Sequence, residues 1–208
     1  MENSSGHRIE TVAQLQALIG EPNPMTPKKL FSALDEAAMD FIRRSPFLVL
    51  ATADAEGYED ASPKGDGPAF VAIEDEHTLL IPERKGNRLM FSLRNILDNP
   101  QVGIIFLVPG TDETFRVNGT AELTDDPDIL VRLSARGAPA LLAIRVTVRE
   151  CFFHCAKAFI RSQLWKPESW AAHQRISFGK ILTAQIGGGE KLAEQIDKKV
   201  EQDYKDNL

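Results

Sequence analysis

Between Pro46 and Phe153, apolar runs of strand length follow one another with little except short turns between them. The runs include F-L-V-L-A-T-A, V-G-I-I-F-L-V and the alternating L-L-A-I-R-V-T-V-R-E. Helices do not alternate with these runs, which disfavours a parallel sheet, because parallel strands need long crossover connections that are usually helical. The pattern therefore predicts an antiparallel sheet closed into a barrel, with an open α+β sandwich as the alternative.

Helical periodicity lies mostly on either side of this strand region. Apolar spacing predicts a helix over Ile9–Ile19 and a second amphipathic helix that begins at an N-cap, Thr26, and stops at Ser45. One short helix, Gly86–Leu97, interrupts the strands and ends at Asn-Pro. Further helical segments follow His154 and the G-G-G of residues 187–189.

The length of 208 residues suffices for one large domain with terminal helices. We expect N-terminal helices that pack on the barrel at residues 1–45, and the barrel domain itself at residues 46–165. A C-terminal extension with a terminal helix should occupy residues 166–208. Its apolar stripe is expected to pack on the body or on a second subunit.

The net charge of -6, with 43% hydrophobic and 26% charged residues, is typical of a globular protein and disfavours a broad nucleic-acid surface. No apolar run approaches the roughly 18 residues of a membrane span. The first ten residues lack the basic flank and apolar core of a signal peptide. Two cysteines are too few for a disulfide framework. The composition predicts a cytoplasmic protein with no nucleic-acid or membrane partner.

Cationic residues gather where the predicted strands end, at positions that a packed core does not need. Arg84, Lys85 and Arg88 lie at or near the start of the Gly86–Leu97 helix, where free N–H groups and the helix dipole favour a phosphate. Lys64 lies in S-P-K-G-D-G-P, a predicted turn that exposes backbone N–H groups beside a cation. A solvated helix face and a plain hairpin turn are the alternatives, but together the two clusters indicate an anion site.

A second pair of cations, Lys157 and Arg161, is spaced i, i+4 on the helix after His154, with no acidic partner at that spacing. Trp165 follows at the end of the same segment. Two interpretations remain open at this point. The pair forms part of an anion site, or it belongs to an exposed helix face that Trp165 anchors.

The segment C-F-F-H-C offers Cys151, His154 and Cys155 as possible zinc ligands, but no second cluster supplies a fourth. In an extended run the two cysteines share one face and His154 points away from it. We therefore expect a buried thiol and no metal site. The chain has no nucleophile elbow, Walker loop, paired-glycine dinucleotide motif or acid–base dyad. That absence suits an enzyme whose cofactor does the chemistry.

Five motifs resemble the FMN-binding split-barrel proteins, specifically the branch related to pyridoxamine 5'-phosphate oxidase. They are D-A-S-P-K-G-D, I-P-E-R-K-G-N-R, N-I-L-D-N-P, F-R-V-N-G-T-A and H-C-A-K-A-F-I-R-S-Q-L-W, and they cover roughly Pro46–Trp165. The resemblance implies a mainly β (α+β) fold, a six-stranded antiparallel split barrel with flanking helices. It further implies a homodimer with one FMN in each of two clefts between the subunits.

The resemblance also implies roles for individual residues. Ser62 and Lys64 would lie beside the isoalloxazine and ribityl groups, and Pro82 would contribute backbone contacts. A second set would hold or help to hold the phosphate: Arg84, Lys85, Asn87, Arg88, Ser92 and Asn95. Contacts from other segments would come from Arg116 of the partner chain and, closing the cleft, from Lys157, Arg161, Ser162 and Trp165.

The function that the resemblance implies is an FMN-dependent oxidoreductase, with hydride transfer between an unidentified small substrate and the flavin. The oxidase's basic strand motif is replaced here by A-S-P-K-G-D, and its substrate-phosphate arginine is not recognisable, so the substrate stays open. One alternative is a non-catalytic flavin- or haem-binding protein on the same barrel, with His154 or His77 as the axial ligand of a haem. A deazaflavin in place of FMN is another.

Overall fold

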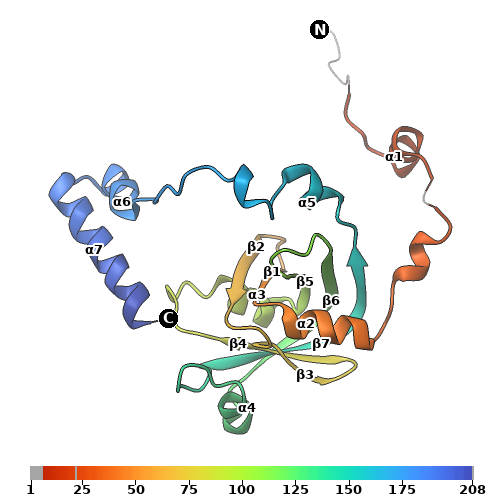
Figure 1. The fold of residues 1–208 in the computed structure, drawn as a ribbon, viewed down its shortest axis with the longest axis horizontal. Coiled ribbons are helices and arrows are strands. Elements are labelled where there is room, and N and C mark those ends of the chain that lie inside the picture. The colour runs from red at the N-terminus through yellow and green to blue at the C-terminus, as the bar shows by residue number, and fades with distance from the viewer. Residues whose placement is uncertain (1–6, 22, 208) are drawn as a thin grey trace.

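The computed structural model describes residues 7–21 and 23–207. Residues 1–6, which begin the predicted N-terminal region, and Pro22 of the predicted linker lie outside the described residues, as does Leu208. In the described part, one antiparallel sheet has seven strands in the order β2-β1-β5-β6-β7-β4-β3 (Figure 1). The strands are β1 Phe47–Ala53, β2 Glu59–Gly65, β3 Ala72–Asp75, β4 Thr78–Glu83, β5 Gln101–Leu107, β6 Thr114–Thr124 and β7 Leu142–His154.

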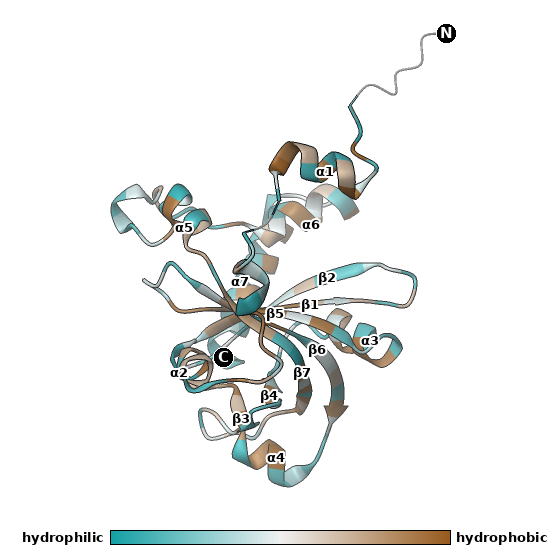
Figure 2. Cartoon of the chain, turned by 90° about the vertical axis from the view of Figure 1, so that its right-hand side faces the viewer, coloured by the Kyte–Doolittle hydropathy of each residue, from teal (hydrophilic) through white to brown (hydrophobic). Residues whose placement is uncertain are grey.

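The predicted antiparallel α+β architecture is confirmed, but the expected number of six strands is wrong. Each of the seven β-prone runs in the sequence finds a hydrogen-bonded neighbour, down to the four-residue edge strand β3. Strands β2 and β3 form the two edges, and no ladder is recorded between them in the described residues. The central strands curve strongly (Figure 2). Closure of this sheet into a split barrel stays a prediction.

Seven α-helices and two short 3-10 helices are found in the described residues. The 3-10 helices are η1 Thr26–Lys29 and η2 Pro167–Ser169. The α-helices are α1 Val12–Ile19, α2 Glu36–Arg44, α3 Phe91–Asp98, α4 Pro127–Arg132, α5 Lys157–Ser162, α6 Phe178–Ile186 and α7 Glu190–Asp206. None of the helices in this part of the chain is both long and apolar enough to cross a membrane.

The second predicted helix begins nine residues later than expected, with its N-cap at Asp35 instead of Thr26. Thr26 starts only the short η1, and the following residues are extended because Phe31 exchanges two backbone hydrogen bonds with Cys151 of β7, at 3.0 and 2.8 Å. Asp35 is the actual N-cap of α2, since its side chain accepts a hydrogen bond from the Ala38 N–H at 2.8 Å. A tertiary strand pairing has overridden the helical spacing there.

The short central helix also begins later, at Phe91 instead of Gly86. Arg88 and Met90 have φ values of +61° and +55°, in the left-handed region that an α-helix does not use. The residues from Arg84 to Met90 therefore form a loop between β4 and α3. As a result, Arg84, Lys85 and Arg88 lie on that loop and not in the first turn of a helix.

The core fills one face of the sheet with alternate residues of its strands. Leu50, Phe106 and Val117 are fully buried. Phe115 packs against Phe153 with a ring separation of 4.9 Å, and against Phe41 of α2 and Phe106 at 6.4 Å each. On the same side, α3 packs against β1, β2 and β6. This packing fixes where α3 begins, and with it the position of the cationic loop.

A substitution of Gly119 tests the close approach of β6 and β7. This glycine lies at a bulge in the β6–β7 ladder, and a Cβ atom there would be 2.1 Å from the Thr147 carbonyl oxygen. We expect Gly119→Ala to lower the free energy of unfolding by about 2–3 kcal/mol, because backbone must move to admit the methyl group. Urea denaturation measures the change.

Gly103→Ala is the matched control, since its Cβ would meet the Asn118 side chain at 3.5 Å, an ordinary contact. A Gly119→Ala variant as stable as Gly103→Ala would contradict the close approach of β6 and β7.

Candidate functional site

A cleft of about 830 Å³ lies between β2, the β4–α3 loop and the start of β7. Most of the residues that line it come from these segments and from the first turn of α3. The lining consists of Ser62, Pro63, Lys64, Glu83, Arg84, Lys85, Gly86, Asn87, Arg88, Leu89, Met90, Phe91, Ser92, Leu93, Leu141, Leu142, Asp203 and Asn207. Seven of the predicted cofactor-binding residues are thus brought together: Ser62, Lys64, Arg84, Lys85, Asn87, Arg88 and Ser92.

Lys64 enters the cleft from a strand and not from the predicted turn. It pairs with Leu48 of β1, and β2 continues as far as Gly65. The Lys64 ammonium donates a hydrogen bond to the carboxylate of Glu83, at the end of β4. Because β2 and β4 stand far apart in the strand order, this ion pair joins two distant parts of the sheet.

Arg84 is also paired within the chain. Its Nε donates to Asp66 Oδ2 at 3.1 Å and its Nη2 to the Leu133 carbonyl oxygen at 2.8 Å. Arg136 donates to the other Asp66 oxygen at 2.7 Å. The Asp66 carboxylate is only 7% exposed. Burial by itself raises the pKa of Asp66, but the Gly67 N–H, Arg136 and Arg84 outweigh it and hold the pKa below its usual range.

Lys85 and Arg88 differ from these two cations. Both are exposed, both line the cleft, and neither is in a recorded ion pair within the described part of the chain. Asn87 lies between them and accepts a hydrogen bond from the Leu89 N–H at 3.0 Å, which shapes the loop. Among the predicted phosphate ligands, Lys85 and Arg88 are therefore the cations available to an anion.

Two serines connect the cleft to the body of the protein. Ser92 of α3 is buried and donates to Ser62 Oγ at 3.2 Å, and Ser62 in turn donates to Asp60 at 2.7 Å. Asn95, one turn further along α3, donates instead to Thr52 of β1 at 3.1 Å and does not line the cleft. Its amide joins α3 to β1, and its expected contact with the phosphate stays a prediction.

Apolar side chains form the rest of the cleft, and the sequence reasoning missed them. Leu89, Met90, Phe91 and Leu141 are each more than half exposed. The exposure of Leu89 could not be read from the sequence, because a helix over Gly86–Leu97 would turn this residue inward. The cleft thus joins two free cations to an exposed apolar surface.

Pro82 and Arg116 lie outside the cleft. Pro82 is buried in β4 opposite Ala143, next to the lining residue Glu83. Arg116 of β6 stands opposite Phe152 of β7, with its guanidinium carbon 5.9 Å from that ring centroid. Its Nε is buried and has no hydrogen-bond partner in the described residues. Phe152 is ten residues along β7 from the cleft residue Leu142, which is about 33 Å at the rise of a strand.

The four residues predicted to close the cleft lie beyond this far end of β7. Lys157, Arg161 and Ser162 belong to α5, and Trp165 follows it. The Trp165 indole N–H donates to the Thr111 carbonyl oxygen at 2.8 Å, and the ring stacks on Phe159 at 5.7 Å. These contacts anchor the segment to the turn between β5 and β6, so none of the four residues reaches the cleft of its own chain.

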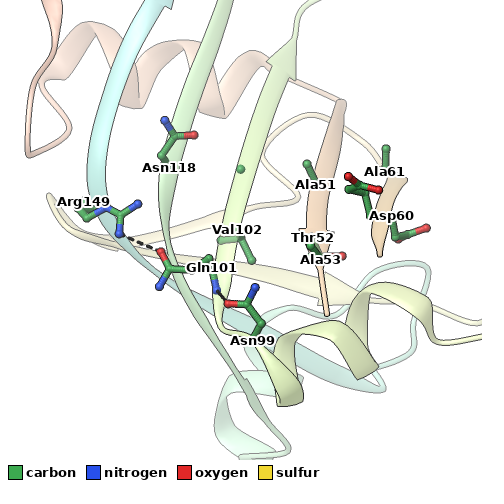
Figure 3. A pocket seen from close by; sticks show the side chains of 12 residues that line it. Ala51, Thr52, Ala53, Asp60, Ala61, Asn99, Gln101, Val102, Asn118 and Arg149 are labelled. Atoms are coloured by element: carbon green, nitrogen blue, oxygen red, sulfur yellow. Dashed lines mark hydrogen bonds between the residues drawn. The ribbon is translucent and has the colours of Figure 1, made fainter. Parts of the chain in front are cut away.

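A second hollow, of about 490 Å³, lies on the outer face of the sheet (Figure 3). Ala61, Ala51, Gly103 and Asn118 form one row across β2, β1, β5 and β6. The first three have almost no side chain, so the sheet surface is open there. Figure 3 shows Arg149 reaching Gln101 at its border, at 2.9 Å. The small side chains of Ala51, Ala61 and Gly103 are visible in the sequence, but only the strand register places them side by side.

The C-F-F-H-C segment forms the end of β7. Cys151 is buried, donates to the Ala33 carbonyl oxygen at 3.3 Å, and has its pKa raised to about 11, first by burial and then by Asp35 and Glu150. Cys155 is exposed. Within the described ranges, no three His, Cys, Asp or Glu side chains are grouped so that they could hold a metal ion. Neither His77 nor His154 lines the cleft.

Sequence comparison identifies the family. The family described as pyridoxamine 5'-phosphate oxidase matches residues 34–155, more than half of the chain, including both strands that border the cleft and the loop between them. The protein therefore belongs to the pyridoxamine 5'-phosphate oxidase family. No curated protein sequence matches it significantly.

Solved structures give weaker likenesses. HupZ from Group A Streptococcus is 21% identical with a TM-score of 0.47, covering 58% of this chain and 93% of HupZ. A Lactobacillus delbrueckii protein provisionally assigned as a pyridoxamine 5'-phosphate oxidase is 25% identical, with a TM-score of 0.46 and coverages of 59% and 95%. An FMN-binding protein from Syntrophomonas wolfei is 8% identical, with a TM-score of 0.43 and coverages of 56% and 88%. With TM-scores this low, these three carry no argument about the ligand.

The pairing of Arg84 with Asp66 predicts a pH-dependent loss of stability. We expect Arg84→Ala to lower the free energy of unfolding at pH 7 by about 2 kcal/mol, because it removes a charged hydrogen bond from a buried carboxylate. The folded-state pKa of Asp66 is depressed, so its stabilisation is complete above its unfolded pKa of about 3.9 and is lost as the pH falls below that.

The difference between the wild type and Arg84→Ala should therefore shrink below about pH 4. Urea titrations at a series of pH values measure it, with Arg43→Ala on the exposed face of α2 as the control. A deficit that is the same at pH 3 and pH 7, or no deficit at all, would show that Arg84 is not held by Asp66.

Proposed function

We propose that this chain binds FMN in the cleft and is an FMN-dependent oxidoreductase that acts on a small substrate. One observation carries the proposal: in a member of this family, two exposed cations, which have no ion-pair partner among the described residues, adjoin an apolar surface within one cleft. In this arrangement Lys85 and Arg88 hold the phosphate. Leu89, Met90, Phe91 and Leu141 offer the surface for the ring system.

The residues present fit this cofactor. FMN has a planar aromatic ring at one end and a doubly charged phosphate at the other, and it needs a site that offers both environments. A volume of about 830 Å³ lies within the usual range for cofactor sites, roughly 300–1,000 Å³. A guanidinium such as that of Arg88 suits a phosphate because it can donate two parallel hydrogen bonds. Lys64 is paired with Glu83, and Arg84 and Arg136 share Asp66, so Lys85 and Arg88 are the loop cations without an ion-pair partner among the described residues.

When bound, the flavin supplies the hydride-accepting and hydride-donating chemistry. The protein's part is to bind and orient it. The Ser62 and Ser92 hydroxyls line the cleft, and because their O–H groups already donate to Asp60 and Ser62, they have lone pairs left to accept hydrogen bonds. The ion pair of Lys64 and Glu83 fixes the distance between β2 and β4, which sets the width of the cleft. The identity of the substrate does not follow from these residues.

We further propose that two copies of the chain form a homodimer through the outer face of the sheet. Ala51, Ala61 and Pro63 are exposed there, and Val49 and Ile105 are half-buried, an apolar surface that a second copy would cover. Arg116 and the α5 segment lie too far from their own cleft to close it. In a dimer they would be available to the cleft of the other copy, as the family resemblance implies.

A haem-binding protein without catalytic activity is the second candidate, and no residue of the cleft favours it. His77 lies in the β3–β4 turn, where its Nδ1 is 3.1 Å from the Ser32 carbonyl oxygen, and His154 ends β7. An absorbance spectrum distinguishes the candidates, because bound flavin gives bands that dithionite bleaches and bound haem gives a Soret band. Mass spectrometry of the released cofactor then separates FMN from a deazaflavin.

The assignment of the phosphate to Lys85 and Arg88 gives a direct test. The double variant Lys85→Ala/Arg88→Ala should bind FMN more weakly by at least about 3 kcal/mol, since each charged hydrogen bond is worth roughly 1.5–3 kcal/mol. Riboflavin, which has no phosphate, should bind the variant and the wild type equally. Quenching of flavin fluorescence measures both affinities.

Arg43→Ala serves as the control for loss of a surface charge. If the double variant lost affinity for FMN and for riboflavin equally, Lys85 and Arg88 would not be the residues that hold the phosphate. A wild-type protein that is colourless and takes up neither flavin would refute the proposed function itself.

The dimer has its own test. Ala51→Arg puts a long charged side chain into the middle of the outer face, and we expect the variant to be monomeric at concentrations where the wild type is dimeric. Sedimentation velocity measures the mass of each. Val131→Arg, on the exposed part of α4, is the control. A dimeric Ala51→Arg protein, or a monomeric wild type that holds FMN, would contradict a shared cleft.

A further inference from the structure

The last turn of α7 lines the cleft, although it is more than sixty residues away in sequence from the other lining residues. Asp203 and Asn207 stand among the residues of the wall together with Lys85 and Arg88. Figure 1 shows α7 running back from the far end of the C-terminal segment so that its end lies beside the sheet. The family match ends at residue 155, so α7 is an addition to the matched part of the chain.

Helices α6 and α7 form one rigid hairpin. A Cβ atom on Gly179 would lie 2.0 Å from the Ala193 carbonyl oxygen, so the two backbones are in direct contact. Asp197 of α7 accepts hydrogen bonds from the Ser177 hydroxyl at 2.5 Å and from the Gly179 N–H at 2.8 Å, which caps α6. Arg175 forms an ion pair with Glu201. The hairpin therefore moves as a unit if it moves.

The hairpin has little else to hold it in place. Residues 171–176, which lead into it, are exposed and form neither helix nor strand. In the described part of the chain α7 packs chiefly on α6, and no strand makes a comparable contact with it. A segment that has few contacts with the rest of the fold can open locally at a small cost in free energy. The end of α7 can therefore leave the cleft and return to it without unfolding the sheet.

The charges at the end of α7 favour its position beside the cations of the cleft. The end of α7 carries Asp203 and Asp206 against one cation, Lys205, while Glu201 is paired with Arg175, and a helix C-terminus adds a partial negative charge of its own. Asp203 is not ion-paired in the described residues; its carboxylate accepts a hydrogen bond from the Asn207 amide at 2.7 Å. This negative end lines the same cleft as the loop whose Lys85 and Arg88 are also without ion-pair partners in the described residues. It is attracted to the same cations that a phosphate would use.

From these contacts we propose that the α6–α7 hairpin is an acidic gate on the cleft, and that a phosphate bound at Lys85 and Arg88 displaces its end. This inference rests on the proposed binding of FMN. Asp203 and the phosphate compete for one positive loop, so the gate lowers the affinity for flavins that carry a phosphate. It leaves the affinity for riboflavin unchanged. The gate therefore regulates the exchange of the cofactor.

The test uses the full chain with FMN and riboflavin as the two probes, and dissociation constants from flavin fluorescence. Asp203→Asn keeps the shape of the side chain and removes its charge. We expect it to bind FMN about three- to tenfold more tightly than the wild type, as expected for one nearby, partly screened charge, with no change for riboflavin. Glu194→Gln removes a charge from the exposed face of α7 far from the cleft and should change neither affinity.

Hydrogen exchange supplies a second readout that needs no variant. Amides in the last two turns of α7 should exchange faster when FMN is bound than in the free protein, because the terminal turns of a helix fray when they lose the contact that orders them. If the wild type binds FMN but Asp203→Asn binds it equally or more weakly, or if exchange in α7 is unchanged or slower, the gate is refuted and the proposed function stands. If no form of the protein binds either flavin, both fail.

Discussion

Two ion pairs, Lys64–Glu83 and Arg84–Asp66, are the interactions on which the rest of the site depends. They connect the end of β2, one edge of the sheet, to the end of β4, near the other edge. Backbone hydrogen bonds do not make this connection in the described residues, so side chains carry it. The Asp66 carboxylate is almost fully buried, and a charge removed from water in this way is stable only if it is paired and hydrogen-bonded. Arg84, Arg136 and the Gly67 N–H meet that requirement together.

This use of Lys64 and Arg84 explains the chemistry of the cleft. Four cations lie close together on β2 and on the loop after β4. Two of them, Lys64 and Arg84, form the ion pairs that connect β2 to β4. The other two, Lys85 and Arg88, extend from a loop that the left-handed backbone of Arg88 and Met90 keeps out of α3. The same backbone turns Leu89, Met90 and Phe91 outward, so cations and apolar side chains face one space. The site is a consequence of where α3 begins.

Much of the fold could be predicted from sequence because its signals are local. The alternating pattern of Leu141–Phe153 gave β7 to within one residue, and the absence of helices between strands indicated an antiparallel sheet. The second helix was predicted wrongly because the backbone pairing of Phe31 with Cys151 joins residues 120 positions apart, and no local pattern reports such a pairing. The strand count of six failed for a different reason. It came from the family resemblance, whereas the chain's own β-prone runs number seven.

The sequence by itself determined the family and the cluster of cations along the strand ends, because motifs and charges are properties of neighbouring residues. Only the tertiary structure decided which of those cations form ion pairs and which stay available to a ligand. The reason is that the partners of Lys64 and Arg84 lie on segments that the sheet brings together. It also separated Arg116 and the α5 segment from the cleft, and placed the acidic end of α7 in the wall. Each of these assignments depends on distances between segments remote in the chain. Such distances are set by the packing of the whole sheet and not by any stretch of it.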